Sequence, residues 1–286
     1  MKTRQEKNKK IRKEITREEH QKKIRIIVKI ISIILITIFS FLSYGMFIGA
    51  KVTYVKEYKV TNSKVPSSFH GIKIVHLSDI LYDSLNSKDL SKIEKKVNNL
   101  EADILVFTGD IKKKDYELKK EDITLLENFF KSLNSSIKKY AVIGDNDNET
   151  FKVIMENSNF EIISNKHQVL YYKENEPINI VGIDSSDINL SNITLDNNYS
   201  ICIIHNPDKI DEVLKSINCD LSLAGDNLGG EIKIPFYKGI LTNNKYYKDY
   251  YELNNTELYI SNGLGSNNNI RLFNHPSISL YRLTKY

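Results

Sequence analysis

Two neighbouring stretches decide the fold of this chain: Ile201-Cys-Ile-Ile-His-Asn-Pro-Asp208 and Asp220-Leu-Ser-Leu-Ala-Gly-Asp-Asn-Leu-Gly-Gly-Glu231. Each begins with a short apolar run, which is typical of a buried β-strand, and each run ends on a polar residue, His205 or Asp226. Because ligands of open α/β sheets lie beyond the carboxyl ends of the strands, these endings indicate a site at one edge of a sheet.

Three stretches upstream repeat this pattern of an apolar run that ends on a carboxylate: Ile72–Asp79, Ile104–Asp110 and Ala141–Asp147. Between them, apolar residues recur at helical spacing over 88–100 and 123–133. This alternating order favours a sheet that is partly parallel and covered by helices, with all five strand ends at one site.

The rest of the chain adds shorter elements and contains no linker that would divide a second domain. We expect a short helix over 149–157 and another over Pro207–Ile217, because proline suits a first helical turn. The remaining apolar runs predict strands at Tyr54–Val60, Gln168–Tyr172, Ile178–Ile183, Ile232–Ile234, Leu258–Ser261, Ile270–Phe273 and Ile278–Leu283.

Composition indicates one large domain behind a basic N-terminal segment. The chain has 286 residues, of which 41% are apolar, enough for a sizeable core. Residues 1–29 contain twelve Lys/Arg and four Asp/Glu, a net charge of +8, so the total of +5 leaves −3 for the remaining 257 residues. No later segment combines basic and aromatic clusters, and we therefore expect no nucleic-acid partner.

The segment from Ile30 to Ala50 is a run of 21 residues without a charge. At about 1.5 Å per residue, such a helix spans roughly 30 Å, the thickness of a bilayer's hydrocarbon core. A buried soluble helix and a cleaved signal peptide are the alternatives, and Tyr44-Gly45 and Gly49-Ala50 leave cleavage open.

The basic cluster precedes this span, so the positive-inside rule places the N-terminus in the cytoplasm. We expect a basic cytoplasmic tail over 1–29, disordered or helical only near the membrane, a transmembrane helix over 30–50, and an extracellular domain over 52–286. The chain would then be a single-pass protein of the plasma membrane, with the lipid bilayer as a partner.

We expect Cys202 and Cys219 to be two small buried thiols. Their spacing matches no metal motif. Neither lies in the kind of small fold that disulfides staple, so a disulfide is the minor alternative.

The polar residues at the strand ends together resemble the motifs of a known protein family. They are Ser78-Asp79, Gly109-Asp110, Gly144-Asp-Asn-Asp147, His205 and Gly225-Asp-Asn-Leu-Gly-Gly230, followed by Gly263-Leu-Gly265 and Arg271-Leu-Phe-Asn-His-Pro276. From about Val52 onward, the chain resembles the calcineurin-like metallophosphoesterase family, especially its bacterial membrane-anchored members. The resemblance implies an α/β fold, a four-layer αββα sandwich of two mixed sheets, with two metal ions at the strand ends.

In that family two divalent metals hold a phosphate and activate a bridging water, and three of its eight metal and catalytic positions are kept here. Asp79, Asp110 and His205 match ligand positions. The other five are substituted: Leu81, Leu228 and Asp226 stand where the family has ligand histidines, Asp145 replaces a ligand asparagine, and Asn146 replaces the catalytic histidine. His70, His76, His167 and His275 match no ligand position.

These substitutions fall mainly on one metal position, because leucine cannot donate to a metal. The first position would keep only Asp79 and the shared Asp110. The second keeps a hard donor set that suits one divalent metal, Mn²⁺ or Mg²⁺ before Zn²⁺, although it could also hold none. The predicted metal ligands are therefore Asp79, Asp110, Asp145, His205 and Asp226.

Asp147 joins these carboxylates, and so many negative charges around at most one metal would repel a phosphate dianion. We therefore expect a membrane-anchored family member with a degenerate, impaired or inactive site that serves as a binding module. The alternative is a weak one-metal phosphoesterase or pyrophosphatase acting on phosphoester or lipid-linked substrates near the membrane. In that case Asp79 or Asp147 would orient water and Asn146 would donate to the phosphate, so the sequence leaves open whether the chain is an enzyme.

Overall fold

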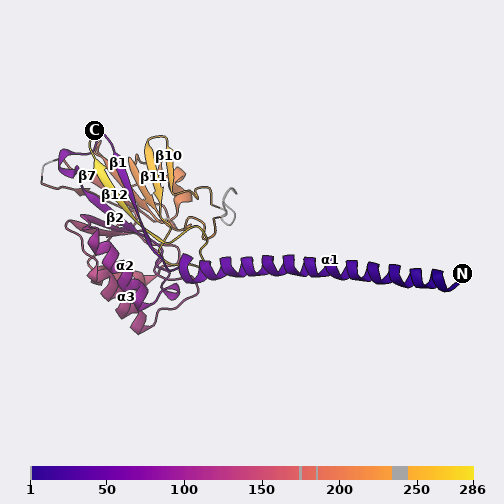
Figure 1. Ribbon diagram of the computed structural model, residues 1–286. Coiled ribbons are helices and arrows are strands. Elements are labelled where there is room, and N and C mark those ends of the chain that lie inside the picture. The colour runs from indigo at the N-terminus through magenta and orange to yellow at the C-terminus, as the bar shows by residue number, and fades with distance from the viewer. Residues whose placement is uncertain (1, 174–175, 185, 234–243) are drawn as a thin grey trace. The chain divides into compact units, whose positions relative to one another are not determined.

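The computed structural model describes residues 2–173, 176–184, 186–233 and 244–286 (Figure 1). The chain divides into two compact units, which are described separately: an N-terminal unit up to Gly45, and a second unit from Met46 to Tyr286.

The N-terminal unit is one long helix, α1 (Lys2–Tyr44), followed by a π-helical turn, η1 (Gly45–Gly49). The expectation that residues 1–29 are disordered or helical only near the membrane is wrong, because α1 runs through them. Neither glycine nor proline occurs before Gly45, and Lys, Arg, Glu and Gln all have high helix propensity.

The apolar part of α1 is long and apolar enough to cross a membrane, and its side chains are exposed. Two of its hydroxyls bond within the helix: Thr37 Oγ1 donates to the carbonyl of Ile33 over 2.9 Å, and Ser40 Oγ donates to that of Ile36 over 2.8 Å. A helix in lipid must satisfy its polar groups internally in this way.

The second unit contains two six-stranded sheets, both mixed. The first has the order β1 (Tyr54–Thr61), β12 (Ser277–Thr284), β2 (Lys73–Leu77), β3 (Ile104–Phe107), β4 (Lys138–Ala141), β5 (Glu161–Ile162). The second has the order β10 (Tyr250–Leu253), β11 (Thr256–Ile260), β9 (Leu221–Ala224), β8 (Ser200–Ile204), β7 (Ile178–Ile183), β6 (Lys166–Leu170).

Strand β2 shows why both sheets are covered on two faces. Its residues alternate: Val75 and Leu77 pack into one core cluster, whereas Ile74 packs into another. The first cluster joins the sheet to helices α2 (Ser87–Asn99), α3 (Lys120–Ser132) and α4 (Glu149–Asn157). The second cluster lies between the sheets, since it also contains residues of β8 and β9.

A third cluster covers the outer face of the second sheet with the 3₁₀ turn η4 (Pro207–Lys209) and the short helix α5 (Ile210–Val213). The layers are therefore helix, sheet, sheet and helix, which confirms the expected αββα sandwich. Two 3₁₀ turns complete the described elements of this unit: η2 (Ser67–Phe69) and η3 (Tyr82–Ser84).

Several local expectations were wrong. The helix over Pro207–Ile217 is only η4 and α5, because the chain turns at Leu214 to reach β9. Residues 270–273 form no strand, and Leu272 makes only an isolated bridge with Ile232. Part of the predicted strand Ile232–Ile234 lies outside the described residues.

The two cysteines are not free thiols. Cys202 and Cys219 form a disulfide, with 5.7 Å between their Cα atoms. Cys202 lies on β8, and Cys219 lies two residues before the neighbouring parallel strand β9, so the sheet itself brings them together. Closing a loop of 17 residues stabilises a folded chain by about 3 kcal/mol.

Candidate metal centre

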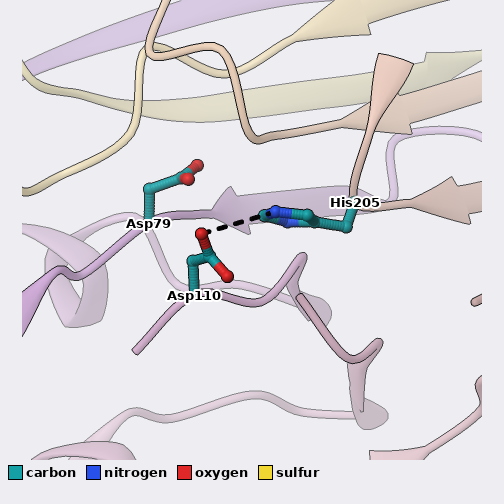
Figure 2. Close-up of side chains that lie close together, drawn as sticks. All are labelled: Asp79, Asp110 and His205. Atoms are coloured by element: carbon teal, nitrogen blue, oxygen red, sulfur yellow. Dashed lines mark ion pairs between the residues drawn. The ribbon is translucent and has the colours of Figure 1, made fainter. Parts of the chain in front are cut away.

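The candidate site lies where the carboxyl ends of five parallel strands meet between the two sheets. Asp79 and Asp110 follow β2 and β3 of the first sheet, and His205 and Asp226 follow β8 and β9 of the second. Figure 2 shows the carboxyl groups of Asp79 and Asp110 beside the ring of His205. Two groups have ligand atoms within 4.8 Å of one another: Asp79, Asp110 and His205, and Asp145, His205 and Asp226.

The imidazole of His205 is the centre of both groups. It is fully buried, and its Nδ1 lies 2.6 Å from the carbonyl oxygen of Thr108, to which it donates. Its Nε2 lies 3.5 Å from Asp110 Oδ2 and 3.8 Å from Asp226 Oδ1. This buried nitrogen has no hydrogen-bond partner among the described residues. The bond to Thr108 fixes the tautomer whose Nε2 lone pair can bind a metal.

Three of the four predicted aspartate ligands have backbone angles that aim their carboxyl groups at this centre. Asp79, Asp110 and Asp226 have φ values of 50°, 60° and 65°, in the left-handed region that residues other than glycine seldom adopt. Such conformations cost free energy and persist where surrounding contacts hold them, often at functional sites. Asp145 differs, because it is exposed at the rim.

The two predicted catalytic residues both contact the Asp110 segment. Asn146 donates to the two carboxylate oxygens of Asp110, from its backbone N–H over 2.9 Å and from its side chain over 2.5 Å. Asp147 accepts backbone N–H groups of Asp110, Ile111 and Gly144 over 2.8–3.0 Å. Asp147 thus holds two loops together, while Asn146 orients the Asp110 carboxylate.

Leucine side chains fill the space beside Asp79. Leu81 and Leu228 are both buried, at 2% exposure each. A Cβ placed on Gly263 would lie 2.4 Å from Leu228 Cδ2 and 2.9 Å from Asp79 Cβ, so these two side chains share one tightly packed surface. A Cβ on Gly265 would lie 2.6 Å from that of Leu81. Neither leucine offers a donor atom.

A chain of buried polar groups behind Asp79 was not anticipated from the sequence. His76 Nε2 lies 2.9 Å from Thr108 Oγ1, Thr108 Oγ1 donates to Ser78 Oγ over 2.8 Å, and Ser78 Oγ donates to Asp79. Burial lowers the pKa of His76 to about 3, so this ring is neutral at physiological pH. His76 within β2, and Ser78 and Thr108 directly after β2 and β3, were the available signal.

The charges of the site are unbalanced. Burial, opposed by the charge of His205 and assisted by those of Asp110 and Asp226, raises the pKa of Asp79 to about 7. Burial also raises the pKa of Asp226 to about 6 and that of Asp147 to about 6. Burial opposes a proton on His205, but the nearby Asp110, Asp79 and Asp226 raise its pKa well above the ordinary value.

These features fit a divalent cation. The orphaned Nε2 of His205 and the carboxylates around it form a hard set of oxygen and nitrogen donors, and a cation would replace the protons they now share. Bound there, the ion would hold a phosphate oxygen and make a bound water more acidic. The fold and the donor set are thus similar to those of metallophosphoesterases.

Comparison with known proteins agrees with that class. No family model matches the chain. The uncharacterized metallophosphoesterase YkuE of Bacillus subtilis is 29% identical over 84% of this chain and 88% of its own length. YkoQ of the same organism, also an uncharacterized metallophosphoesterase, is 28% identical over 74% and 83%. The UDP-2,3-diacylglucosamine pyrophosphatase LpxG of Chlamydia muridarum is 26% identical over 77% and 86%.

The two-sheet fold and these relatives support the resemblance of the chain to the calcineurin-like metallophosphoesterase family. Its N-terminal apolar helix is consistent with the membrane-anchored members.

The raised pKa values predict that cation binding depends on pH. At pH 5 the folded chain keeps protons on Asp79 and Asp226, whose pKa values are about 7 and about 6, and at pH 8 it has lost them. Ligands must be deprotonated to bind a metal, so Mn²⁺ affinity should rise at least about tenfold between pH 5 and pH 8. Titration calorimetry in two buffers of different ionisation enthalpy measures the affinity and the protons released. Asp79→Asn should have a shallower pH dependence, and equal affinity at both pH values would contradict the prediction.

Proposed function

We propose that this chain is a membrane-anchored metallophosphoesterase-family protein with a degenerate active site, which holds one divalent cation and has little or no catalytic turnover. The buried Nε2 of His205, which has no hydrogen-bond partner among the described residues and lies between Asp110 and Asp226, carries the proposal. The ligands would be Asp79, Asp110, Asp145, His205 and Asp226, with Mn²⁺ or Mg²⁺ favoured because most of their donor atoms are carboxylate oxygens.

Leu81 and Leu228 support the loss of a second cation. Both are buried next to Asp79, where further donors would be needed. The two ligand groups share His205, and a single imidazole nitrogen binds one ion. The remaining acidic charge also disfavours a phosphate dianion, since one divalent ion does not neutralise four carboxylates. A phosphoester would therefore bind weakly, and its turnover would not exceed that of Mn²⁺ alone.

Metal stoichiometry tests this proposal. The full-length chain, loaded with Mn²⁺ and dialysed, should retain about one equivalent by elemental analysis, because one complete donor set remains. Asp145→Asn combined with Asp226→Asn should lose most of it. Leu81→His combined with Leu228→His restores two donors and should raise the content toward about two equivalents. Less than about a tenth of an equivalent, or two equivalents in the unsubstituted chain, would refute a one-cation site.

A weak one-metal phosphoesterase or pyrophosphatase is the second candidate. The named activity of the LpxG relative favours it, together with the direct contact between Asn146 and Asp110. Here Asn146 would donate to a phosphate oxygen, Asp79 or Asp147 would orient the water, and the substrate would be a phosphoester or lipid-linked phosphate at the membrane surface.

Hydrolysis of an aryl phosphodiester with Mn²⁺ separates the two candidates. The first predicts turnover no greater than that of Mn²⁺ alone. The second predicts slow turnover that falls at least about 100-fold in Asp110→Asn and in Asp145→Asn, because each removes a ligand charge. Asp187→Asn removes an exposed carboxylate outside the site and should change nothing. Activity that survives both ligand substitutions would exclude this site as its source.

For topology we propose a basic cytoplasmic tail over 1–29, a single span over 30–50, and an extracellular domain over 52–286. The basic residues before the span support this orientation. The disulfide between Cys202 and Cys219 also supports it, because disulfides persist mainly in oxidising compartments.

The redox state of these cysteines in cells tests the orientation. Cells lysed into denaturant with a thiol-alkylating polymer should yield unlabelled chain, and reduction before labelling should add two polymers, one for each cysteine. Chain that is labelled without reduction would contradict an extracellular domain.

A further inference from the structure

Residues 51–55, which follow the proposed span directly in the chain, present an apolar surface on the second unit. Val52, Tyr54 and Val55 are 39%, 51% and 40% exposed. We refer to these three residues, together with Phe273 and His275, as the juxtamembrane face. Exposed apolar side chains that lie together in this way mark a surface for a membrane or a partner.

The loop before β12 belongs to the same face. The ring centroid of His275 lies 4.7 Å from that of Tyr54, and its Nδ1 lies 3.2 Å from the carbonyl oxygen of Gly49. The backbone N–H of Tyr54 donates to the carbonyl of Pro276 over 2.8 Å. Two residues earlier, Phe273 is half exposed and has a φ of 56°, a strained conformation for an aromatic residue.

A basic pocket opens beside the same segment. It has a volume of about 170 Å³ and lies between residues 50–53 and helix α2. Its cationic side chains are Lys51, Lys92 and Lys96, and its one acid is Asp89. Lys51 contacts Asp89 over 3.1 Å, and Lys92 lies 4.0 Å from Asp89.

The third lysine joins the pocket to the face, because Lys96 Nζ donates to the carbonyl of Thr53 over 2.6 Å. Three ammonium groups against one carboxylate leave the pocket positive. Its walls are also partly apolar, with Val52 and Leu264 among them. A positive pocket with apolar walls matches the phosphate and upper chain of an anionic phospholipid.

Continuity with the span identifies the occupant. The face begins two residues after the proposed span ends at residue 50, so the covalent chain keeps it close to the bilayer that this span would cross. Aromatic and basic side chains are the groups that settle at a membrane interface. We propose that the juxtamembrane face docks on the bilayer surface and that the pocket between Lys51, Lys92 and Lys96 takes the phosphate of an anionic phospholipid.

The absence of tryptophan from the chain makes a direct test simple, because a single introduced indole is the only one present. Phe273→Trp and Val55→Trp are made in the full-length chain and placed in nanodiscs whose lipids carry brominated, quenching acyl chains. Tyr286→Trp is the control, since Tyr286 lies beyond the opposite end of β12 from Ser277, the partner of Tyr54. We expect quenching at both face positions and little at the control.

The lysine pocket is tested in the same nanodiscs. Adding about one third phosphatidylglycerol to phosphatidylcholine should increase quenching of Phe273→Trp about twofold, since each lysine near an anionic surface adds to binding. Lys92→Glu should abolish that increase. Lys95→Glu makes the same charge change on the same helix, does not line the pocket, and should retain the increase.

Each outcome decides the proposal. Docking is overturned if the tryptophans on the face are quenched no more than that of Tyr286→Trp. If Phe273→Trp does not fold, Val55→Trp alone decides this comparison. Blue-shifted but unquenched emission would mean that a second copy of the chain covers the face, which also overturns it. Equal effects of Lys92→Glu and Lys95→Glu would remove the phosphate pocket. None of these readouts depends on metal binding or hydrolysis, so they fail independently of the proposed function.

Discussion

The hydrogen bond from His205 Nδ1 to the carbonyl of Thr108 joins the two sheets at the point where their strand ends meet. His205 follows β8 of the second sheet, and Thr108 follows β3 of the first. A second link crosses the same seam, because the backbone N–H of Asp226 donates to Asp79 Oδ2 over 3.2 Å. The candidate site is therefore part of the packing between the sheets, and its ligands cannot move apart without separating them.

This location explains how a chain can keep the shell of a metal site while its chemistry changes. Leu81 and Leu228 are buried and pack against glycines, so they contribute apolar contact where histidine would contribute a donor. Burying an unpaired imidazole costs free energy, whereas burying leucine is favourable. Loss of the acids would destabilise the loops more, since Asp110 and Asp147 accept the hydrogen bonds that shape the loops around them.

Much of this fold could be predicted from the sequence because its strands carry a strong signal. The run Ile104–Phe107 is apolar at every position, as expected of a strand buried on both faces, and the predicted strand Ile178–Ile183 has the observed bounds. The site positions were also predictable, because parallel strands bring their carboxyl ends together whatever their sequence separation. The distances among those side chains could not be predicted from the sequence. The sharing of His205 by both ligand groups could not be predicted either.

Two of the failures, the cysteine pairing and the strand expected at 270–273, have a common physical cause, because each depended on a contact between distant segments. Cys202 and Cys219 are brought together by strand pairing, which spacing alone does not reveal. Leu272 was predicted to be part of a strand. Arg271 beside it is fully buried and bonds to backbone carbonyls of other loops, and these bonds fix the course of the segment, so it does not pair along a sheet edge.

The same guanidinium shows why the C-terminal loop matters to the site. Arg271 has no carboxylate within salt-bridge distance among the described residues, yet it is buried near Asp79, and burial lowers its pKa to about 10 while Glu231 and Asp79 raise it. A buried cation costs free energy unless its hydrogen bonds are satisfied, and backbone carbonyls satisfy it here. Its charge remains, and it offsets part of the negative charge of the acid cluster. One fixed cation from the C-terminal loop thus neutralises part of the acidic charge, as metal ions do in bimetal hydrolases.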